Sequence, residues 1–216
     1  MQVSPSIIAT EFLKLSQTLN LLNESEADYI HCDIMDGNFV PNLTFGMTIF
    51  AEIAQFSQKP LEAHLMIQNP EKYIPDFQKA GAQIITIHYE GNLHVHRTLN
   101  QIKSLGCQAG LAINPSTPIE CVLDLICEVD IICLMSVNPG FYGQPFIPRT
   151  LSKIQRLKNL ILQEKSSALI EVDGGVTFEN IPNIAAAGAD IVVAGNTVFR
   201  HPKYTIHQAI AELKKF

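Results

Sequence analysis

The sequence predicts an α/β fold of the (β/α)8 barrel type, and two observations support that prediction. Short runs rich in β-branched residues alternate with longer amphipathic stretches along all 216 residues, which is typical of parallel strands joined by helices. Eight such units in a chain of this length are typical of one barrel domain, residues 1–216. A doubly wound open sheet is the alternative, because periodicity alone does not show whether a sheet closes.

Each unit begins with a short apolar run and continues into a stretch whose apolar residues have helical spacing. The eight expected strands are Val3–Ile8, Tyr29–Ile34, Leu61–Met66, Ile84–His88, Ala109–Ile113, Ile131–Met135, Ala168–Val172 and Ile191–Ala194. The expected helices include Glu11–Asn23, Pro70–Ala80, Val95–Ser104, Thr150–Glu164, Glu179–Ala187 and Ile206–Lys215. The last strands are almost entirely apolar, as expected of parallel strands covered on both faces. Gly81, Gly106 and Gly188 each stand between a helix and the next strand, where a left-handed C-cap belongs.

The composition predicts a compact globular protein without a nucleic-acid or membrane partner. Apolar residues make up 47% of the chain and charged residues 17%, which argues against disorder. A net charge of −6 argues against binding to nucleic acid or an anionic membrane, and no apolar run approaches the ~20 residues of a membrane span. The first residues show no sign of a signal peptide, and none of the five cysteines forms a CxxC pair. We therefore expect buried free thiols and a cytoplasmic location.

Four polar residues at three expected strand ends are the candidates for chemistry. His31 and Asp33 share one face of the second strand, His64 lies near the end of the third, and Asp173 follows the seventh. Two imidazoles and two carboxylates can hold a divalent metal and still supply acids and bases. His88 ends the fourth strand without a matching partner, so a structural role and a functional role both stay open for it.

Glycines after the last strands predict an anion site. Gly174 and Gly175 follow the seventh strand, Gly195 and Asn196 follow the eighth, and a further loop after the sixth strand contains Gly140, Phe141, Tyr142 and Gly143. In a barrel, glycines after the seventh and eighth strands let backbone N–H groups approach a phosphate. A small phosphorylated molecule is therefore the expected ligand.

Seven segments, in this order along the chain, resemble the signature segments of the ribulose-phosphate 3-epimerase family. They are His31–Gly37, Val40–Asn42, His64–Met66, Asn114–Pro118, Met135–Phe141, Gln144–Pro148 and Glu171–Gly175. The resemblance covers nearly the whole chain. It implies a phosphate-binding (β/α)8 barrel that interconverts D-ribulose 5-phosphate and D-xylulose 5-phosphate in the pentose phosphate pathway, without an organic cofactor.

The resemblance also implies roles for individual residues. It makes His31, Asp33, His64 and Asp173 the metal ligands, with Asp33 and Asp173 as the acid/base pair on opposite faces of the substrate. The positions that match substrate and phosphate contacts are Ser6, His64, Gly140, Phe141, Tyr142, Gly143, Asp173, Gly174, Gly175, Gly195 and Asn196. Met35, Met66 and Met135 match methionines that close around the reacting carbons, although core filling explains them equally well.

The chemistry of C3 inversion beside a C2 ketone agrees with this assignment. One carboxylate on each face can remove and return the proton, and a metal on the C2 and C3 oxygens stabilises the enediolate. The ligand set of nitrogen and oxygen donors suits one Zn²⁺, with Fe²⁺, Mn²⁺ or Co²⁺ as alternatives. Family members are commonly oligomeric, so a homo-oligomer is expected.

Two departures from the family pattern leave the substrate length open. Tyr142 stands where a glycine is usual, and would be strained if that position required a positive φ. Asn196 replaces the usual serine but keeps a backbone N–H and an amide donor. A six-carbon ketose phosphate such as D-allulose 6-phosphate is therefore the alternative substrate.

Two other functions fit the sequence less well. Related decarboxylases and aldolases carry an Asp-x-Lys-x-x-Asp segment, whereas Met35 stands two residues after Asp33, so their lysine is missing. A non-catalytic sugar-phosphate or metal-binding barrel would be expected to lack a ligand or an acid/base residue. Both His residues and both Asp residues of the expected set are present.

Overall fold

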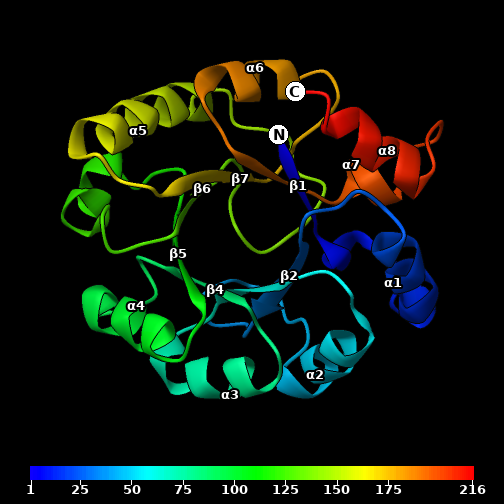
Figure 1. The fold of residues 1–216 in the computed structure, drawn as a ribbon, viewed down its shortest axis with the longest axis horizontal. Coiled ribbons are helices and arrows are strands. Elements are labelled where there is room, and N and C mark those ends of the chain that lie inside the picture. Colours follow the sequence, from blue (N-terminus) through cyan, green and yellow to red (C-terminus); the bar gives the residue numbers. More distant parts are fainter.

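The computed structural model describes all 216 residues, and eight parallel strands form the ring at its centre (Figure 1). The strands are β1 (Gln2–Pro5), β2 (Ile30–Met35), β3 (Leu61–Met66), β4 (Ile84–His88), β5 (Gln108–Ile113), β6 (Ile131–Met135), β7 (Leu169–Asp173) and β8 (Ile191–Ala194). From β2 to β8 each strand pairs in parallel with the next one in the sequence, and β1 pairs in parallel with β8. A single parallel bridge between Ser6 and His31 links β1 to β2, so the ring is nearly closed. This order confirms the barrel and excludes the doubly wound sheet, whose strand order reverses.

Helices surround the ring on its outside (Figure 1). The α-helices are α1 (Leu15–Asn23), α2 (Met47–Phe56), α3 (Ile74–Lys79), α4 (Val95–Ser104), α5 (Thr150–Glu164), α6 (Ile181–Ala187), α7 (Asn196–Phe199) and α8 (Ile206–Leu213). Short 3-10 helices are η1 (Ile7–Ala9), η2 (Phe12–Lys14), η3 (Pro70–Lys72) and η4 (Ile119–Leu125). The last of these connects β5 to β6 in place of an α-helix.

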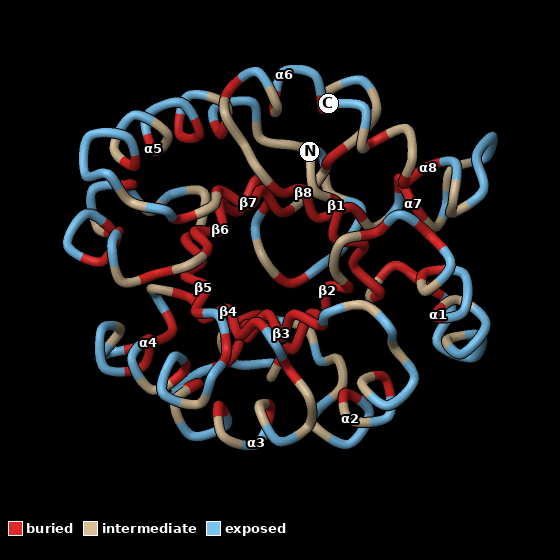
Figure 2. Tube along the Cα trace, in the orientation of Figure 1, coloured by how far each residue is buried: buried red, intermediate tan, exposed pale blue.

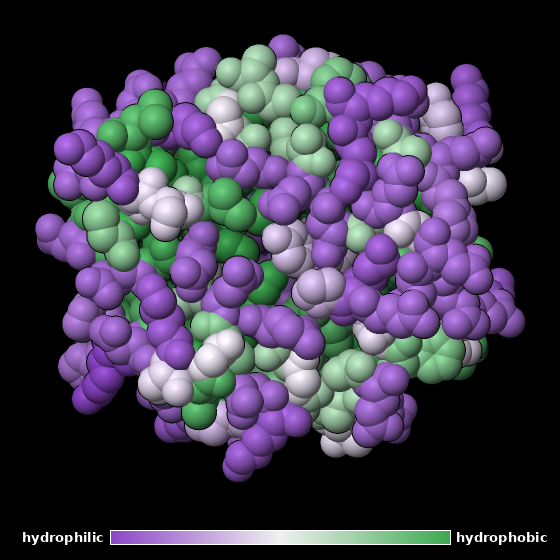
Figure 3. All heavy atoms as spheres, viewed as in Figure 1, coloured by the Kyte–Doolittle hydropathy of each residue, from purple (hydrophilic) through white to green (hydrophobic).

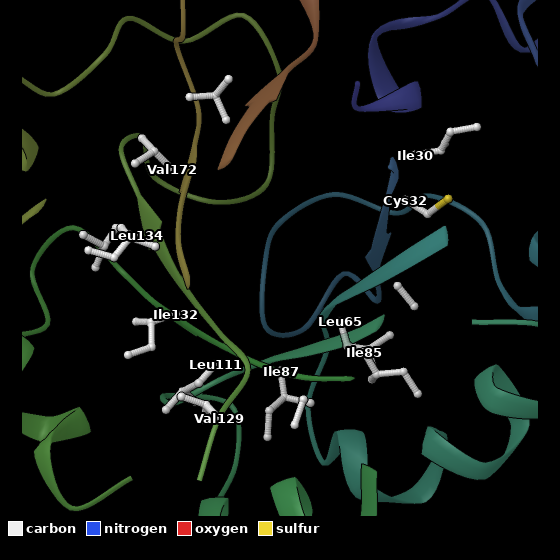
Figure 4. Packing of buried hydrophobic residues seen from close by; sticks show 14 of the residues in the cluster. Ile30, Cys32, Leu65, Ile85, Ile87, Leu111, Val129, Ile132, Leu134 and Val172 are labelled. Carbon is white, nitrogen blue, oxygen red and sulfur yellow. The ribbon is translucent and has the colours of Figure 1, made fainter. Parts of the chain in front are cut away.

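The main core lies between the strands and the helices. Outward-facing strand residues such as Ile85, Ile87, Leu111 and Ile132 form one buried cluster with helix residues (Figure 4). The burial pattern follows the same layers (Figure 2). The strands of the ring are buried except for the first residues of β1, β5 and β7, while the outer sides of the helices are exposed. Alternation along each strand leaves the other half of the strand side chains inside the barrel.

The barrel interior is layered from apolar to polar along the strand direction. Ile84, Ile131 and Ile191 form an apolar cluster near the start of their strands. Buried polar side chains such as Glu62, Thr86 and Glu171 follow, and the candidate site residues come next, toward the strand ends. This end of a barrel is where barrel enzymes carry their active sites.

Hydrophilic side chains cover most of the face in Figure 3, and hydrophobic ones show mainly between α5 and the centre. No helix combines the length and the apolar character needed to cross a bilayer. All five cysteines are free thiols, as expected, but Cys121 is only half-buried and Cys127 is exposed.

Several boundaries differ from those expected from the sequence. The first strand ends at Pro5, because the chain turns into η1 at Ile7. The expected helices over Glu11–Asn23 and Pro70–Ala80 each begin with a separate 3-10 turn. Helix α2 has no counterpart among the helices expected from the sequence; its β-branched and aromatic residues have modest helix propensity. By contrast, α4 and α5 have the bounds that their spacing predicts.

Candidate active site

A cavity of about 490 Å³ opens at the C-terminal ends of the strands. Asp33 and Asp173 line it together with three methionines, Met35, Met66 and Met135. The loops after β6, β7 and β8 form the rest of its wall. This volume falls in the usual range for small-molecule sites. The methionines thus contact both the cavity and the protein interior, where all three are buried.

Asp33 and Asp173 bring their donor atoms close to those of two imidazoles that are fully buried and do not line the cavity. We call these four side chains the rim cluster: His31, Asp33, His64 and Asp173. Nε2 of His31 lies 3.4 Å from an Asp33 oxygen and 3.8 Å from an Asp173 oxygen. Nδ1 of His64 lies 3.5 Å from each of the same two oxygens. The two imidazole nitrogens are 3.1 Å apart.

These separations suit a tetrahedral metal ion. Donors at about 2.0–2.2 Å from a tetrahedral Zn²⁺ lie roughly 3.3–3.6 Å from one another, and the five distances in the rim cluster run from 3.1 to 3.8 Å. Two imidazole nitrogens and two carboxylate oxygens are also a donor set that zinc and similar divalent ions accept. The rim cluster could therefore hold one divalent cation.

The electrostatics of the rim cluster favour a positive charge at its centre. Burial opposes protonation of the two imidazoles, but facing carboxylates outweigh it. Glu62 and Asp33 raise the pKa of His31 well above its ordinary value, and Asp173 and Asp33 raise the pKa of His64 to about 9. Burial also opposes ionisation of Asp33, yet His31 and His64 hold the pKa of this carboxyl well below its usual range. A metal ion would take the place of the protons that this field attracts.

Hydrogen bonds fix the rim carboxylates and their backbone. The Ser6 hydroxyl donates to the Asp33 carboxylate, and this contact joins the end of β1 to β2. The Thr44 hydroxyl donates to the backbone carbonyl of Asp33 over 2.6 Å. The Ser136 hydroxyl donates to the backbone carbonyl of Asp173 over 2.9 Å. Sequence reasoning singled out Ser6 but missed Thr44, in the loop after β2, and Ser136, directly after β6, because neither residue shows a local signal of this contact.

A second buried group lies deeper in the barrel; we call it the inner cluster: His31, Glu62 and Glu171. Nδ1 of His31 lies 2.9 Å from Glu62, and the Thr86 hydroxyl donates to the other Glu62 oxygen over 2.6 Å. Burial opposes ionisation of Glu62, but His31 and Thr86 lower its pKa to about 2. Burial and the neighbouring Glu62 charge raise the pKa of Glu171 well above its ordinary value. The surroundings of the inner cluster therefore favour the ionised form of Glu62 and the protonated form of Glu171.

The glycines of the expected phosphate loops are required by close packing. Gly174 and Gly175 have φ of +115° and +64°. A Cβ on Gly174 would lie 2.4 Å from Val137, and one on Gly175 would lie 2.5 Å from the backbone nitrogen of Phe146. These contacts press the loop after β7 against the loop after β6. Gly195 and Asn196 also line the cavity, so the structure brings the expected phosphate residues together on one side.

Tyr142 lines the cavity without backbone strain, because its φ is not positive. Its hydroxyl is 3.2 Å from the Arg200 guanidinium, which also lies over its ring at 5.0 Å from the centroid. Arg200 is anchored by a hydrogen bond from its Nε to the backbone carbonyl of Ala9. No lysine or arginine lines the cavity itself. Arg200, which no sequence signal indicated, thus brings a cation to a residue of the cavity wall.

A nearly closed (β/α)8 barrel with paired carboxylates and glycine loops at the C-terminal ends of its strands is typical of the class of (β/α)8-barrel enzymes. Residues 2–199 match the model of the family described as ribulose-phosphate 3 epimerase, so the chain belongs to the ribulose-phosphate 3-epimerase family.

Relatives with that name cover nearly all of this chain. The ribulose-phosphate 3-epimerase of Synechocystis sp. is 46% identical over 98% of this chain and 92% of its own. The ribulose-phosphate 3-epimerase of Escherichia coli K12 is 43% identical over 99% of this chain and 96% of its own. These comparisons confirm the resemblance expected from the sequence.

Solved structures confirm the fold alone. A mutant tryptophan synthase α-subunit from Pyrococcus furiosus covers 100% of this chain and 98% of its own, with a TM-score of 0.73 at 17% identity. At that identity the likeness carries no conclusion about activity.

Proposed function

We propose that this protein is a metal-dependent epimerase that interconverts D-ribulose 5-phosphate and D-xylulose 5-phosphate. The observation that carries the proposal is the rim cluster, in which two carboxylates face the cavity beside two imidazoles. The names and extensive coverage of the relatives support the same substrate. The substrate is a small phosphorylated ketose in each direction.

We propose that His31, Asp33, His64 and Asp173 hold one divalent cation, Zn²⁺ or, as alternatives, Fe²⁺, Mn²⁺ or Co²⁺. The separations and the chemistry of the donor set support this assignment. When bound, such a cation supplies Lewis-acid stabilisation of negative charge on the sugar oxygens.

Asp33 and Asp173 would act as the two acid/base groups. One carboxylate removes the C3 proton from one face, which gives an enediolate of the sugar, and the other returns a proton to the opposite face. Both side chains line the cavity, and they come from β2 and β7 on different sides of the barrel. The Ser6 hydroxyl holds the Asp33 carboxylate in place, which leaves fewer orientations for proton transfer.

We propose that the phosphate lies against the backbone N–H groups of Gly174, Gly175, Gly195 and Asn196. Amides must supply most of the attraction, because no cationic side chain lines the cavity. Phe141, Tyr142 and the flanking Gly140 and Gly143 would cover the substrate from the loop after β6. Clamping of the phosphate orients the sugar for both proton transfers.

The experiment that tests this function compares two substrates on zinc-loaded protein. D-Ribulose 5-phosphate should be converted to D-xylulose 5-phosphate without an organic cofactor, faster than D-allulose 6-phosphate is epimerised at C3. Protein treated with a chelator is the matched control. Conversion of the six-carbon substrate alone would contradict the proposed substrate but not the proposed epimerisation chemistry. Turnover of neither substrate would contradict the proposed function.

A further inference from the structure

His64 faces two different environments through its two ring nitrogens. Nδ1 points into the rim cluster, 3.5 Å from the carboxylates of Asp33 and Asp173. Nε2 lies 2.9 Å from Nε2 of His88, and both imidazoles are fully buried. A hydrogen bond between two ring nitrogens needs one protonated donor and one unprotonated acceptor. The direction of this bond therefore decides which nitrogen of His64 carries its lone pair.

The environment of His88 sets that direction. Its Nδ1 lies 3.3 Å from a Glu90 carboxylate oxygen, and an ionised carboxylate only accepts hydrogen bonds. A neutral His88 must then carry its proton on Nδ1 and accept at Nε2. His64 in turn donates from Nε2, and its Nδ1 lone pair is left facing the rim cluster, which is the state that a metal ligand requires.

Glu90 is itself held in place from the next unit of the barrel. It follows β4, and its other carboxylate oxygen accepts a hydrogen bond of 2.8 Å from the backbone N–H of Asn114. The Thr117 hydroxyl donates to the same oxygen. Asn114 and Thr117 both follow β5. The loops after two adjacent strands, β4 and β5, therefore fix Glu90, the last residue of the hydrogen-bonded series His64, His88 and Glu90. The Phe39 ring also packs against His88, 4.7 Å away between centroids, and it offers no competing donor or acceptor.

We propose that His88 and Glu90 are positioning residues that fix the tautomer and orientation of His64 for metal binding through Nδ1. The inference rests on the proposed metal-dependent function and adds two residues to it. His88 is not a fifth ligand, because its Nε2 is taken up by Nε2 of His64, the ring nitrogen that points away from the other rim residues, and its Nδ1 by Glu90. Glu62 gives His31 an equivalent partner directly, at 2.9 Å from its Nδ1. Carboxylate partners behind ligating imidazoles raise metal affinity in this way.

The test measures zinc affinity by competition with a chromophoric chelator and the visible absorption of the Co²⁺-loaded protein. His88→Leu removes the acceptor for His64 and should weaken Zn²⁺ binding about 10- to 100-fold with a changed Co²⁺ spectrum. His88→Gln keeps a carbonyl oxygen that can accept from Nε2, and should recover most of the affinity. His96→Gln, at an exposed histidine on α4, is the matched control and should bind like the wild type.

A second variant keeps the proposal testable where His88→Leu fails to fold. Glu90→Gln removes the charge that selects the tautomer, and Glu90 is partly exposed, so the fold should tolerate the change. A folded Glu90→Gln or His88→Leu protein with wild-type Zn²⁺ affinity and an unchanged Co²⁺ spectrum would overturn the proposal. A wild-type protein that binds Zn²⁺ tightly but epimerises neither ketose phosphate would contradict the proposed function, while weaker Zn²⁺ binding by His88→Leu would still support the positioning role.

Discussion

The rim cluster and the inner cluster both combine imidazole and carboxyl groups and share His31, yet they differ in access to the cavity. Asp33 and Asp173 of the rim cluster line the cavity, whereas Glu62 and Glu171 of the inner cluster do not. Glu171 and Asp173 lie two residues apart on β7, and only Asp173 reaches the cavity. Two positions along a strand keep the same inward face and change only the depth.

Depth also changes what the carboxylates do. In the inner cluster the pKa values of Glu62 and Glu171 move in opposite directions, so the pair shares one negative charge, which His31 and Thr86 stabilise. In the rim cluster, carboxylates surround the imidazoles and attract a cation. In the inner cluster Glu62 thus supports His31, whereas one Glu171 oxygen is buried without a hydrogen-bond partner. The rim cluster, by contrast, could hold a divalent cation.

The largest expected effect is loss of an acid/base group from the rim. Asp173→Asn should slow net epimerisation by at least the ~10²–10⁴-fold typical of a lost general acid/base. In D₂O the wild type should place deuterium at C3 of the product, because each carboxylate exchanges its proton with water. A metal-loaded Asp173→Asn protein should exchange the C3 hydrogen of one epimer without inverting it, as followed by NMR. Retention of the original hydrogen in the wild-type product would exclude the two-base scheme.

The next largest expected effect is on zinc binding, which should depend on the rim imidazoles but not on the inner carboxyl group of Glu171. Chelation should abolish turnover and Zn²⁺ should restore it. His31→Ala and His64→Ala should each lose bound zinc, since a four-coordinate site without one ligand has too few donors. Glu171→Gln should keep one zinc per chain. Metal analysis of the purified variants measures this, and stoichiometric zinc in active His31→Ala protein would contradict the ligand assignment.

The third effect separates the two carboxyls of the inner cluster. Glu62 is ionised and accepts from His31 and Thr86, so Glu62→Gln should lower the free energy of unfolding by roughly 1–3 kcal/mol. Burial and the Glu62 charge raise the pKa of Glu171 and so favour its protonated form, so the isosteric Glu171→Gln should change the free energy of unfolding by less than about 1 kcal/mol. Urea denaturation of both variants at pH 7 measures the difference. An equal loss of stability in the two variants would contradict the assignment of the negative charge to Glu62.

The sequence predicted the rim cluster better than its supports. Alternation along β2 places His31 and Asp33 on one face, and the barrel fold brings strand ends together, so simple geometry was enough to group the four residues. Glu62 could have been found by the same alternation, since it precedes His64 by two residues on β3. The bond between His64 and His88 depends on how far each side chain reaches between neighbouring strands, which a local pattern does not contain.

Contacts between distant loops were beyond sequence reasoning for a similar reason. Tyr142 and Arg200 lie 58 positions apart, and nothing near either residue indicates the other. The strands, by contrast, begin and end within about two residues of expectation except for β1, whose apolar pattern continues into η1. Apolar periodicity indicates burial rather than strand geometry. Because Ile7 and Ala9 of η1 are buried like the strand before them, the pattern did not show where β1 ends.

The smallest expected effect concerns pH and the histidine behind the rim. Burial is the main cause that lowers the pKa of His88 to about 4, against an opposing effect of Glu90. Below its ordinary pKa near 6.5, the unfolded chain binds a proton that the folded protein does not, so stability falls as the pH decreases from 6.5 toward 4. Between pH 7 and pH 5 this contribution should cost metal-free wild type roughly 1–2 kcal/mol of unfolding free energy. The His88→Gln variant has no titrating group at position 88. Between pH 7 and pH 5 its free energy of unfolding should therefore fall by less than that of the wild type, by the same amount. Urea denaturation at the two pH values compares the proteins, and equal pH dependence of the two would mean that His88 is already protonated in the fold, which would leave it unable to accept the hydrogen bond from His64.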